Sequence, residues 1–307
     1  MSELGGEIRR LARGERDFML SLLEELVSLE SPSDDVESQG PVQERLSRSL
    51  SDLGFRVRRI PGRRTGGVLY AVPRKRVRGR GAQLLLGHSD TVWPRGTLET
   101  MPLREEGGRL MGPGVFDMKG GLVQMVVALR ILRTLGLEPP LTPVVLVNSD
   151  EEIGSPESGR VIRRLARRVV RAFIPEPSMG PEGRVKTTRK GWSRFTLKVT
   201  GRAAHAGLDP EGGASAILEL AHLIQALHAM TDLEEGVTVN VGVIRGGSRS
   251  NVIAPEASAE VDIRVLRQAQ AREVEEAIRS LDTTVPGTSL EVVARGAVPP
   301  LEPTPGN

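Results

Sequence analysis

The spacing of hydrophobic residues along the chain changes near residue 184, and the first part reads as an α/β domain. Continuous apolar runs indicate strands that are buried on both faces, whereas apolar residues that recur every three or four positions indicate helices. Because strands and helices alternate, we expect a mostly parallel sheet. Strands are expected at 55–60, 68–72, 82–92, 141–147 and 170–175, and helices at 17–29, 42–53, 120–135 and 158–168. Ser31, Pro32 and Ser33 are interpreted as the stop of the first helix.

Beyond residue 184 the strands alternate polar and apolar positions, which is typical of a half-exposed antiparallel sheet. The order of elements is βαββαβ, which predicts a small α+β sandwich as a separate domain. The strands are expected at 185–200, 237–245, 257–266 and 288–294, with helices at 213–230 and 270–281. The predicted domains are therefore 1–186 and 187–296, followed by an extended stretch at 297–307 that is expected to start a return to the first domain.

The composition limits the chemistry that the chain can perform. Its 307 residues include no cysteine, which excludes disulfides, thiolate zinc sites and a cysteine nucleophile. Any metal must therefore be held by His, Asp or Glu. No apolar run reaches the roughly 18 residues of a membrane span, and the N-terminus lacks the apolar core of a signal peptide. We therefore expect a cytoplasmic protein with no membrane partner.

The charge is less informative than the high isoelectric point implies. The net charge is only +3, and arginine supplies nearly all of the cations. Two arginine-rich stretches, 56–64 and 74–80, could form a phosphate-binding patch or could be solvated loops between strands. Aromatic residues make up only 3% of the chain, so no stacking platform accompanies the charge. The solvated loops are favoured, and no nucleic-acid partner is expected.

Candidate chemistry gathers where the predicted parallel strands end, which is where open α/β sheets place their ligands. His88 and Asp90 follow one strand, and residues two apart on extended backbone face the same side. That arrangement suits a metal-ligating imidazole with a carboxylate that orients it. Taken alone, a histidine with satisfied hydrogen bonds at a strand end is the commoner explanation.

Three further acidic segments lie beside the predicted strands and helices. Asp117 is framed by glycines but lacks the third glycine of a dinucleotide loop, so it is better placed to bridge cations. Asp150, Glu151 and Glu152 directly follow a buried strand, where a cation would remove their mutual repulsion, although a solvated acidic turn is the simpler reading of this run by itself. Glu176 lies between two prolines at another strand end.

In combination these segments resemble a known family. The order of HSDTV, GPGVFDMKGG, NSDEEIGSPES and GRAAHAG along the chain is similar to that of the aminoacylase, glutamate carboxypeptidase and succinyl-diaminopimelate desuccinylase family of dinuclear zinc hydrolases. The segment NSDEEIGSPES is nearest to the glutamate carboxypeptidase-like members of this family. The resemblance implies a phosphorylase/hydrolase-like zinc-peptidase catalytic domain with an inserted α+β sandwich lid. It also implies two divalent metal ions, zinc first with cobalt or manganese as alternatives.

The resemblance further implies a role for each matching residue. His88 and Glu176 would hold one metal ion, Asp117 would bridge to the second, and Glu152 would bind the second. Glu151 would be the general base that takes a proton from the bridging water, and Asp90 would orient His88. A cis peptide bond is expected between Asp117 and Met118. In the lid domain, His205 would stabilise the oxyanion from the partner subunit, while Asn251 and Arg264 would bind a substrate carboxylate.

The resemblance implies a metal-dependent hydrolase that cleaves an amide bond of a small peptide or N-acyl amino acid with a free carboxylate. A homodimer formed through the lid domain is expected. Family members return to the catalytic domain after the lid and add a final His ligand, and no segment of this sequence matches that return. The alternative is therefore a truncated inactive relative that keeps only a lid, dimerisation or binding role.

Overall fold

The computed structural model describes residues 3–77 and 79–304. The chain divides into two compact units, Met1–Gly183 and Arg184–Asn307, and each is described by itself. No described helix is long and apolar enough to cross a membrane.

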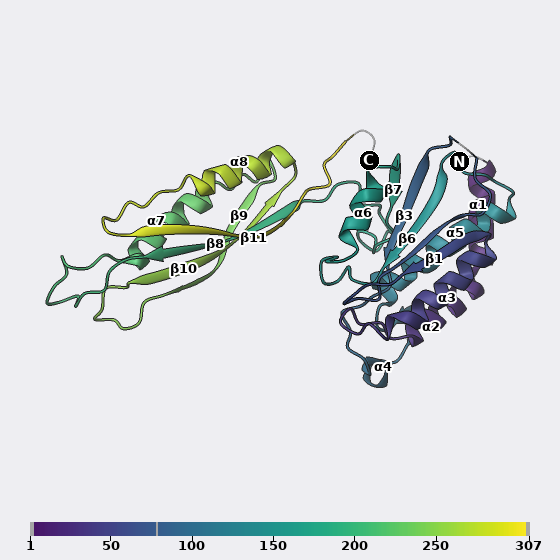
Figure 1. The fold of residues 1–307 in the computed structure, drawn as a ribbon, viewed down its shortest axis with the longest axis horizontal. Helices are drawn as coiled ribbons and strands as arrows, with labels where there is room; N and C mark the ends of the chain where they lie inside the picture. Colours follow the sequence, from purple (N-terminus) through teal and green to yellow (C-terminus); the bar gives the residue numbers. More distant parts are fainter. Residues whose placement is uncertain (1–2, 78, 305–307) are drawn as a thin grey trace. The chain divides into compact units, whose positions relative to one another are not determined.

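The first unit contains a mixed five-stranded sheet in the order β1-β2-β6-β3-β7 (Figure 1). The neighbours β6, β3 and β7 run parallel, whereas β1 and β2 join antiparallel. The α/β class is thus confirmed, with fewer parallel pairs than expected because β1 and β2 are joined by a short connection and form a hairpin. The strands are β1 (Phe55–Ile60), β2 (Val68–Pro73), β3 (Ala82–His88), β6 (Thr142–Asn148) and β7 (Arg171–Phe173).

Helices cover both faces of this sheet. On one face, α2 (Arg16–Ser28), α3 (Gln39–Asp52) and α5 (Gly120–Thr134) build the main core with residues such as Leu26, Leu46 and Val126. On the other face, α6 (Gly159–Ala166) packs against Leu84 and Leu146. All seven residues of β6 are buried, which explains the continuous apolar run of this strand.

Several elements of the first unit have no counterpart among the predicted ones. The helix α1 (Glu3–Gly14) has no fully buried residue, and only Ile8, Leu11 and Ala12 pack partly against the core. Its many charged positions therefore give it a weak hydrophobic signal. The other additions are short: α4 (Thr97–Thr100), β4 (Arg104–Glu106), β5 (Arg109–Met111) and the helical turn η1 (Val115–Lys119).

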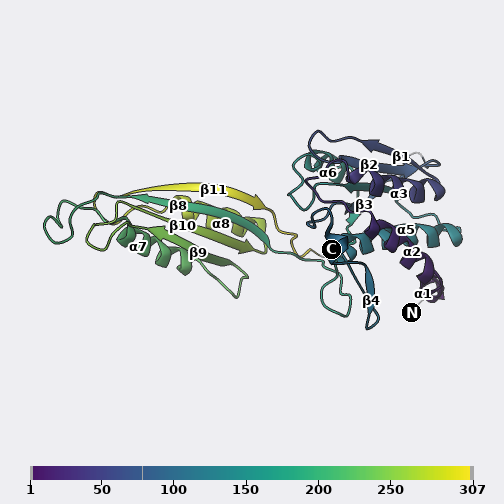
Figure 2. The same ribbon diagram turned by 90° about the horizontal axis from the view of Figure 1, so that it is seen from below.

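The second unit is an antiparallel sheet with both helices on one face. The strand order is β11-β8-β10-β9, which Figure 2 shows. Alternate residues such as Leu197, Val199 and Ile263 face α7 and α8 and form the core. The expected α+β order is confirmed. The elements are β8 (Gly191–Thr200), α7 (Ala216–Ala229), β9 (Thr238–Gly246), β10 (Glu256–Val265), α8 (Gln268–Arg279) and β11 (Ser289–Val298).

Two strand limits in this unit differ from the prediction. The strand β8 begins at Gly191, so 185–190 precedes it as irregular chain. The strand β11 continues to Val298, beyond the predicted end at residue 294. Its register shifts between Ala294 and Gly296, and this shift interrupts the alternation that marks a strand in the sequence. Residues 297 and 298, expected to start a return to the first domain, therefore lie in this sheet.

Candidate metal centre

The acidic and imidazole residues of the first unit meet at one edge of its sheet. His88 is the last residue of β3 and pairs with Asn148, the last residue of β6. Glu151 and Glu152 follow in the turn after β6, and Glu176 follows β7. The carboxyl ends of parallel strands share an edge, so the topology brings these side chains together.

The other three predicted metal ligands, Asp117, Glu152 and Glu176, lie around His88. One ligand atom each of His88, Asp117 and Glu152 lie within 4.8 Å of one another. The imidazole Nε2 lies 3.1 Å from Asp117 Oδ1 and 3.5 Å from Glu176 Oε1. An imidazole among carboxylate oxygens is a donor set that zinc, manganese and cobalt accept. The residues present therefore fit a divalent metal centre.

Asp90 lies beneath this cluster and is completely buried. Its backbone oxygen lies 3.0 Å from His88 Nδ1, and its carboxylate Oδ1 lies 3.5 Å from the same nitrogen. These contacts occupy the inner ring nitrogen and leave Nε2 directed at the other ligands, as a metal-binding histidine requires.

The crowding of carboxylates shifts the titration of the whole cluster. Burial alone would lower the pKa of His88, but its hydrogen bonds to Asp90 and Glu176 and their charges outweigh burial and raise the pKa to about 11. Loss of hydration and the charge of Asp117 raise the pKa of Glu152 to about 7. Loss of hydration, followed by charge repulsion, also raises the pKa of Glu151 and Asp117. A cation would relieve this repulsion.

Asp150 does not belong to the cluster. The prediction that its carboxylate faces those of Glu151 and Glu152 is wrong. Its Oδ2 accepts the backbone N–H groups of Glu157 and Ser158, each at 2.9 Å. Its Oδ1 accepts Nδ2 of Asn148 at 3.1 Å. Asp150 is thus a buried anchor for the start of α6.

The segment from Asp117 to Gly121 is shaped by its neighbours. The peptide bond between Asp117 and Met118 is cis, as expected. Lys119, which the sequence analysis did not assign, is buried and donates from Nζ to the backbone oxygen of Leu29 at 2.9 Å. A side chain at Gly121 would collide with the backbone oxygen of Pro175, so α5 approaches the residue before Glu176 closely.

The three predicted substrate-binding residues lie in the second unit. His205 and Asn251 are close, because His205 pairs with Val252 and the N–H of Ala206 donates to the backbone oxygen of Asn251. Arg264 lies toward the other end of β10, where Asp262 accepts hydrogen bonds from its Nε at 2.7 Å and from a terminal nitrogen at 3.2 Å. Within this unit, therefore, Arg264 is not brought beside His205 and Asn251.

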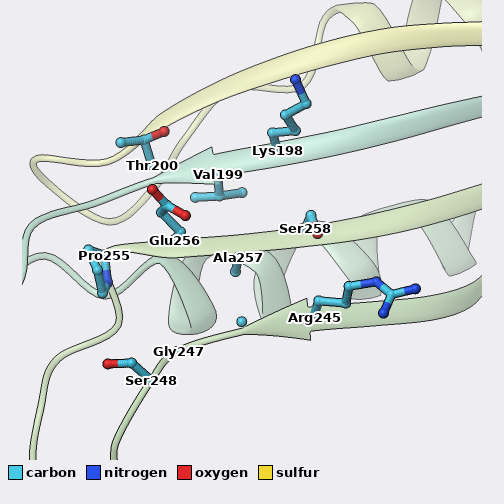
Figure 3. A pocket seen from close by; sticks show the side chains of 11 residues that line it. Lys198, Val199, Thr200, Arg245, Gly247, Ser248, Pro255, Glu256, Ala257 and Ser258 are labelled. Atoms are coloured by element: carbon cyan, nitrogen blue, oxygen red, sulfur yellow. The ribbon is translucent and has the colours of Figure 1, made fainter.

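The second unit also has a pocket of about 530 Å³ over β8, β9 and β10. Figure 3 shows Lys198, Arg245 and Glu256 around it. None of the described residues predicted for the site lines this pocket. The chemistry at the edge of the first sheet is a separate feature.

The residues at the edge of the first sheet form a cluster of His and carboxylate groups that fits a divalent metal ion. The chain is also similar to several known proteins. Residues 187–284 match the peptidase dimerisation domain. The chain is 31% identical over 258 residues to carboxypeptidase G2 of Pseudomonas sp. (strain RS-16), covering 83% of this chain and 62% of that protein. It is 32% identical over 247 residues to acetylornithine deacetylase of Myxococcus xanthus, covering 75% and 62%.

Solved structures share the fold. An aminopeptidase PepT of Bacillus cereus superposes with a TM-score of 0.76 at 20% identity, covering 94% of this chain and 78% of that one. An M20 family metallo-carboxypeptidase of Sulfolobus solfataricus gives a TM-score of 0.62 at 18% identity, covering 92% and 78%.

The chain resembles the M20 peptidases and, among them, the glutamate carboxypeptidase-like members, so the resemblance inferred from the sequence is confirmed. It spans about 62% of the length of the two curated relatives described above.

Proposed function

We propose that the chain is a metal-dependent amide hydrolase whose metal centre is the His88 cluster. The observation that carries this proposal is the convergence of His88, Asp117 and Glu152 within 4.8 Å from separate segments of the chain. The curated relatives are named as a carboxypeptidase and a deacetylase, and both names describe amide hydrolysis.

In this proposal the ligands would be divided between two ions. His88 and Glu176 would hold the first ion, Glu152 would hold the second, and Asp117 would be a ligand of both. Zinc is the first candidate, with cobalt and manganese as alternatives. Bound there, such ions would supply Lewis acidity toward water and the amide carbonyl.

The remaining residues position groups or move a proton. Glu151 directly precedes Glu152 in the turn after β6, and loss of hydration raises the pKa of its carboxylate, which suits a general base that must accept a proton. Asp90 fixes the ring of His88 through the contacts at Nδ1.

The proposed substrate is a small peptide or N-acyl amino acid with a free carboxylate. Arg264 offers a guanidinium that can pair with a carboxylate in a fork. Asn251 would join Arg264 in binding this carboxylate, and His205, whose neighbour Ala206 donates to the backbone oxygen of Asn251, would stabilise the oxyanion from the partner subunit. The names of the relatives, a carboxypeptidase and an acetylornithine deacetylase, agree with this class of substrate.

The proposed oligomer is a homodimer formed through the second unit. The edge strand β9 carries Ile244, which is 63% exposed, and the adjoining face of α7 carries Ile217, which is 47% exposed. Ile217 lies against Gly246 at the end of β9, so these apolar side chains adjoin. An edge strand beside exposed apolar groups favours pairing with a second copy.

A second candidate is a chain without hydrolytic activity that keeps a lid or dimerisation role. It is favoured by the ligand count, because Asp117 and Glu152 are two ligands for the second ion, whereas catalytic zinc usually has three protein ligands. The metal content of the purified chain distinguishes the two: about two tightly held ions per chain support the hydrolase, and one or none supports the second candidate.

The test of the activity itself is hydrolysis of N-acyl amino acids and dipeptides by the zinc-loaded chain, with Glu151→Gln as the matched inactive control. Release of the amino acid by the unaltered chain alone supports the proposal. Equal rates in both proteins contradict it. Cytoplasmic localisation and the absence of nucleic-acid partners stay predictions.

A further inference from the structure

The carboxylate of Asp90 connects parts of the site that lie far apart in sequence. Its Oδ1 accepts the backbone N–H of Glu151 at 3.3 Å, and its Oδ2 accepts that of Glu152 at 3.2 Å. The same carboxylate lies 3.5 Å from Nδ1 of His88. One buried group therefore fixes both a predicted ligand ring and the turn that carries Glu151 and Glu152.

The shortest hydrogen bond to this carboxylate comes from a residue outside the family motifs quoted above. The hydroxyl of Ser33 donates to Asp90 Oδ2 at 2.7 Å, and the two residues are 57 positions apart. Ser33 is 5% exposed and Asp90 is fully buried, so water cannot easily take the place of the hydroxyl.

The backbone around Ser33 is held on several sides. The N–H of Ser33 donates to the backbone oxygen of Thr91 at 3.3 Å, and the N–H of Thr91 donates to that of Ser31 at 2.9 Å. The amide Nε2 of Gln39 donates to the backbone oxygens of Ser31 and Pro32 at 2.8 and 2.9 Å. These bonds fix the backbone that carries the Ser33 hydroxyl, whose other acceptor, the backbone oxygen of Thr91, lies farther away at 3.5 Å.

We propose that Ser33 is a positioning residue of the metal centre, whose hydroxyl holds the Asp90 carboxylate and through it both the His88 imidazole and the Glu151–Glu152 turn. This inference rests on the proposed function. Without the hydroxyl, Oδ2 keeps the single backbone donor from Glu152, and the carboxylate can rotate away from the ring and the turn. Outer partners of metal ligands usually change metal affinity by about 10–100-fold when they are removed.

Ser31 provides a matched control. Its hydroxyl is also buried and also donates to the same strand end, at 2.6 Å, but its acceptor is the backbone oxygen of Ser89 rather than the Asp90 carboxylate. A general loss of packing would affect Ser31→Ala and Ser33→Ala alike. A positioning role affects only the second.

The experiment measures zinc affinity by competition with a chromophoric chelator, together with the cobalt absorption spectrum and the unfolding midpoint, for the full chain and three variants. We expect Ser33→Ala to weaken zinc binding by about 10–100-fold and to change the cobalt spectrum. Ser33→Thr keeps a hydroxyl and should restore both, and Ser31→Ala should bind zinc as the unaltered chain does.

Two results would overturn the inference by itself: zinc affinity of Ser33→Ala within about twofold of the unaltered chain, or an equal loss in Ser33→Ala and Ser31→Ala. If the unaltered chain binds neither zinc nor cobalt, the proposed function fails and this inference fails with it.

Discussion

The imidazole Nε2 of His88 lies 3.1 Å from Oδ1 of Asp117, although 29 residues separate them. His88 ends β3, and Asp117 lies in the turn that leads into α5. In a metal-free chain this contact is an ion pair, because the surrounding carboxylates raise the pKa of His88 to about 11. A cation bound at this position would displace the proton of the His88 imidazole, and the pH dependence of metal binding described below follows from that exchange.

Mutation should distinguish the catalytic role proposed for Glu151 from the metal-binding role proposed for Glu152. Glu151→Gln should abolish hydrolysis and leave the metal content unchanged, because Glu151 is proposed to accept a proton from water and not to hold a metal ion. Glu152→Gln should lose metal, because it removes a ligand charge. Activity assays with elemental analysis of both variants measure the difference. Loss of metal from Glu151→Gln would mean that the two roles are exchanged.

Zinc binding should release protons and strengthen with pH. Metal ligands bind deprotonated, so His88 with a pKa of about 11 must lose its proton at any pH below that value. Glu152, with a pKa of about 7, is mostly protonated at pH 6 and mostly ionised at pH 8. Calorimetry in buffers of different ionisation enthalpy should thus find about two protons released at pH 6 and about one at pH 8.

The same exchange sets the pH dependence of affinity. Each displaced proton raises the affinity about tenfold per pH unit, so the His88 proton contributes about 100-fold from pH 6 to pH 8 and the Glu152 proton about tenfold more, which gives a rise of about 1,000-fold. Any zinc that Glu152→Gln still binds should release a nearly constant number of protons over this range. An affinity that does not change with pH would contradict the protonated state of His88.

The close approach of α5 to the segment before Glu176 can be tested with Gly121→Ala. The added methyl group would collide with the backbone oxygen of Pro175, and relief of this overlap should displace Glu176. We expect weaker zinc binding and a loss of about 1–3 kcal/mol in the free energy of unfolding. Gly14→Ala is the control, since a methyl group there meets no atom within 4 Å. Equal behaviour of the two variants in denaturant and zinc titrations would refute the expected contact.

The homodimer can be tested on the two edges of the second sheet. Ile244→Asp places a charge on the exposed part of β9, and light scattering should show a change from two chains to one, because the buried charge would lack a partner. Val298→Asp is the control, because Val298 is 48% exposed on the opposite edge strand, β11. A dimer that survives the first change and dissociates with the second would place the interface on the other edge.

The sequence pattern predicted the elements whose burial is regular. The strand β6 and the helix α5 are buried over most of their length, so their apolar spacing is clear. The helix α1 was missed because it packs only a few partly buried residues against the core. The end of β11 was missed because a register shift breaks the alternation.

The candidate site was predictable where it depends on strand ends and less so where it depends on distant hydrogen bonds. His88 and Glu152 could be proposed as neighbours because parallel strands end at one edge. Ser33 was interpreted as a helix stop, and its partner Asp90 lies 57 residues away. Asp150 was grouped with Glu151 and Glu152 because the sequence cannot show that its carboxylate accepts the backbone N–H groups of Glu157 and Ser158.

The most direct test of the metal centre is a zinc titration of the metal-free chain beside Asp117→Asn, with bound metal counted after dialysis. Asp117 is proposed to bridge both ions, so the account predicts about two tightly held zinc ions per unaltered chain and the loss of both in the variant. Zinc that stays bound to Asp117→Asn, or an unaltered chain that holds none, would contradict it.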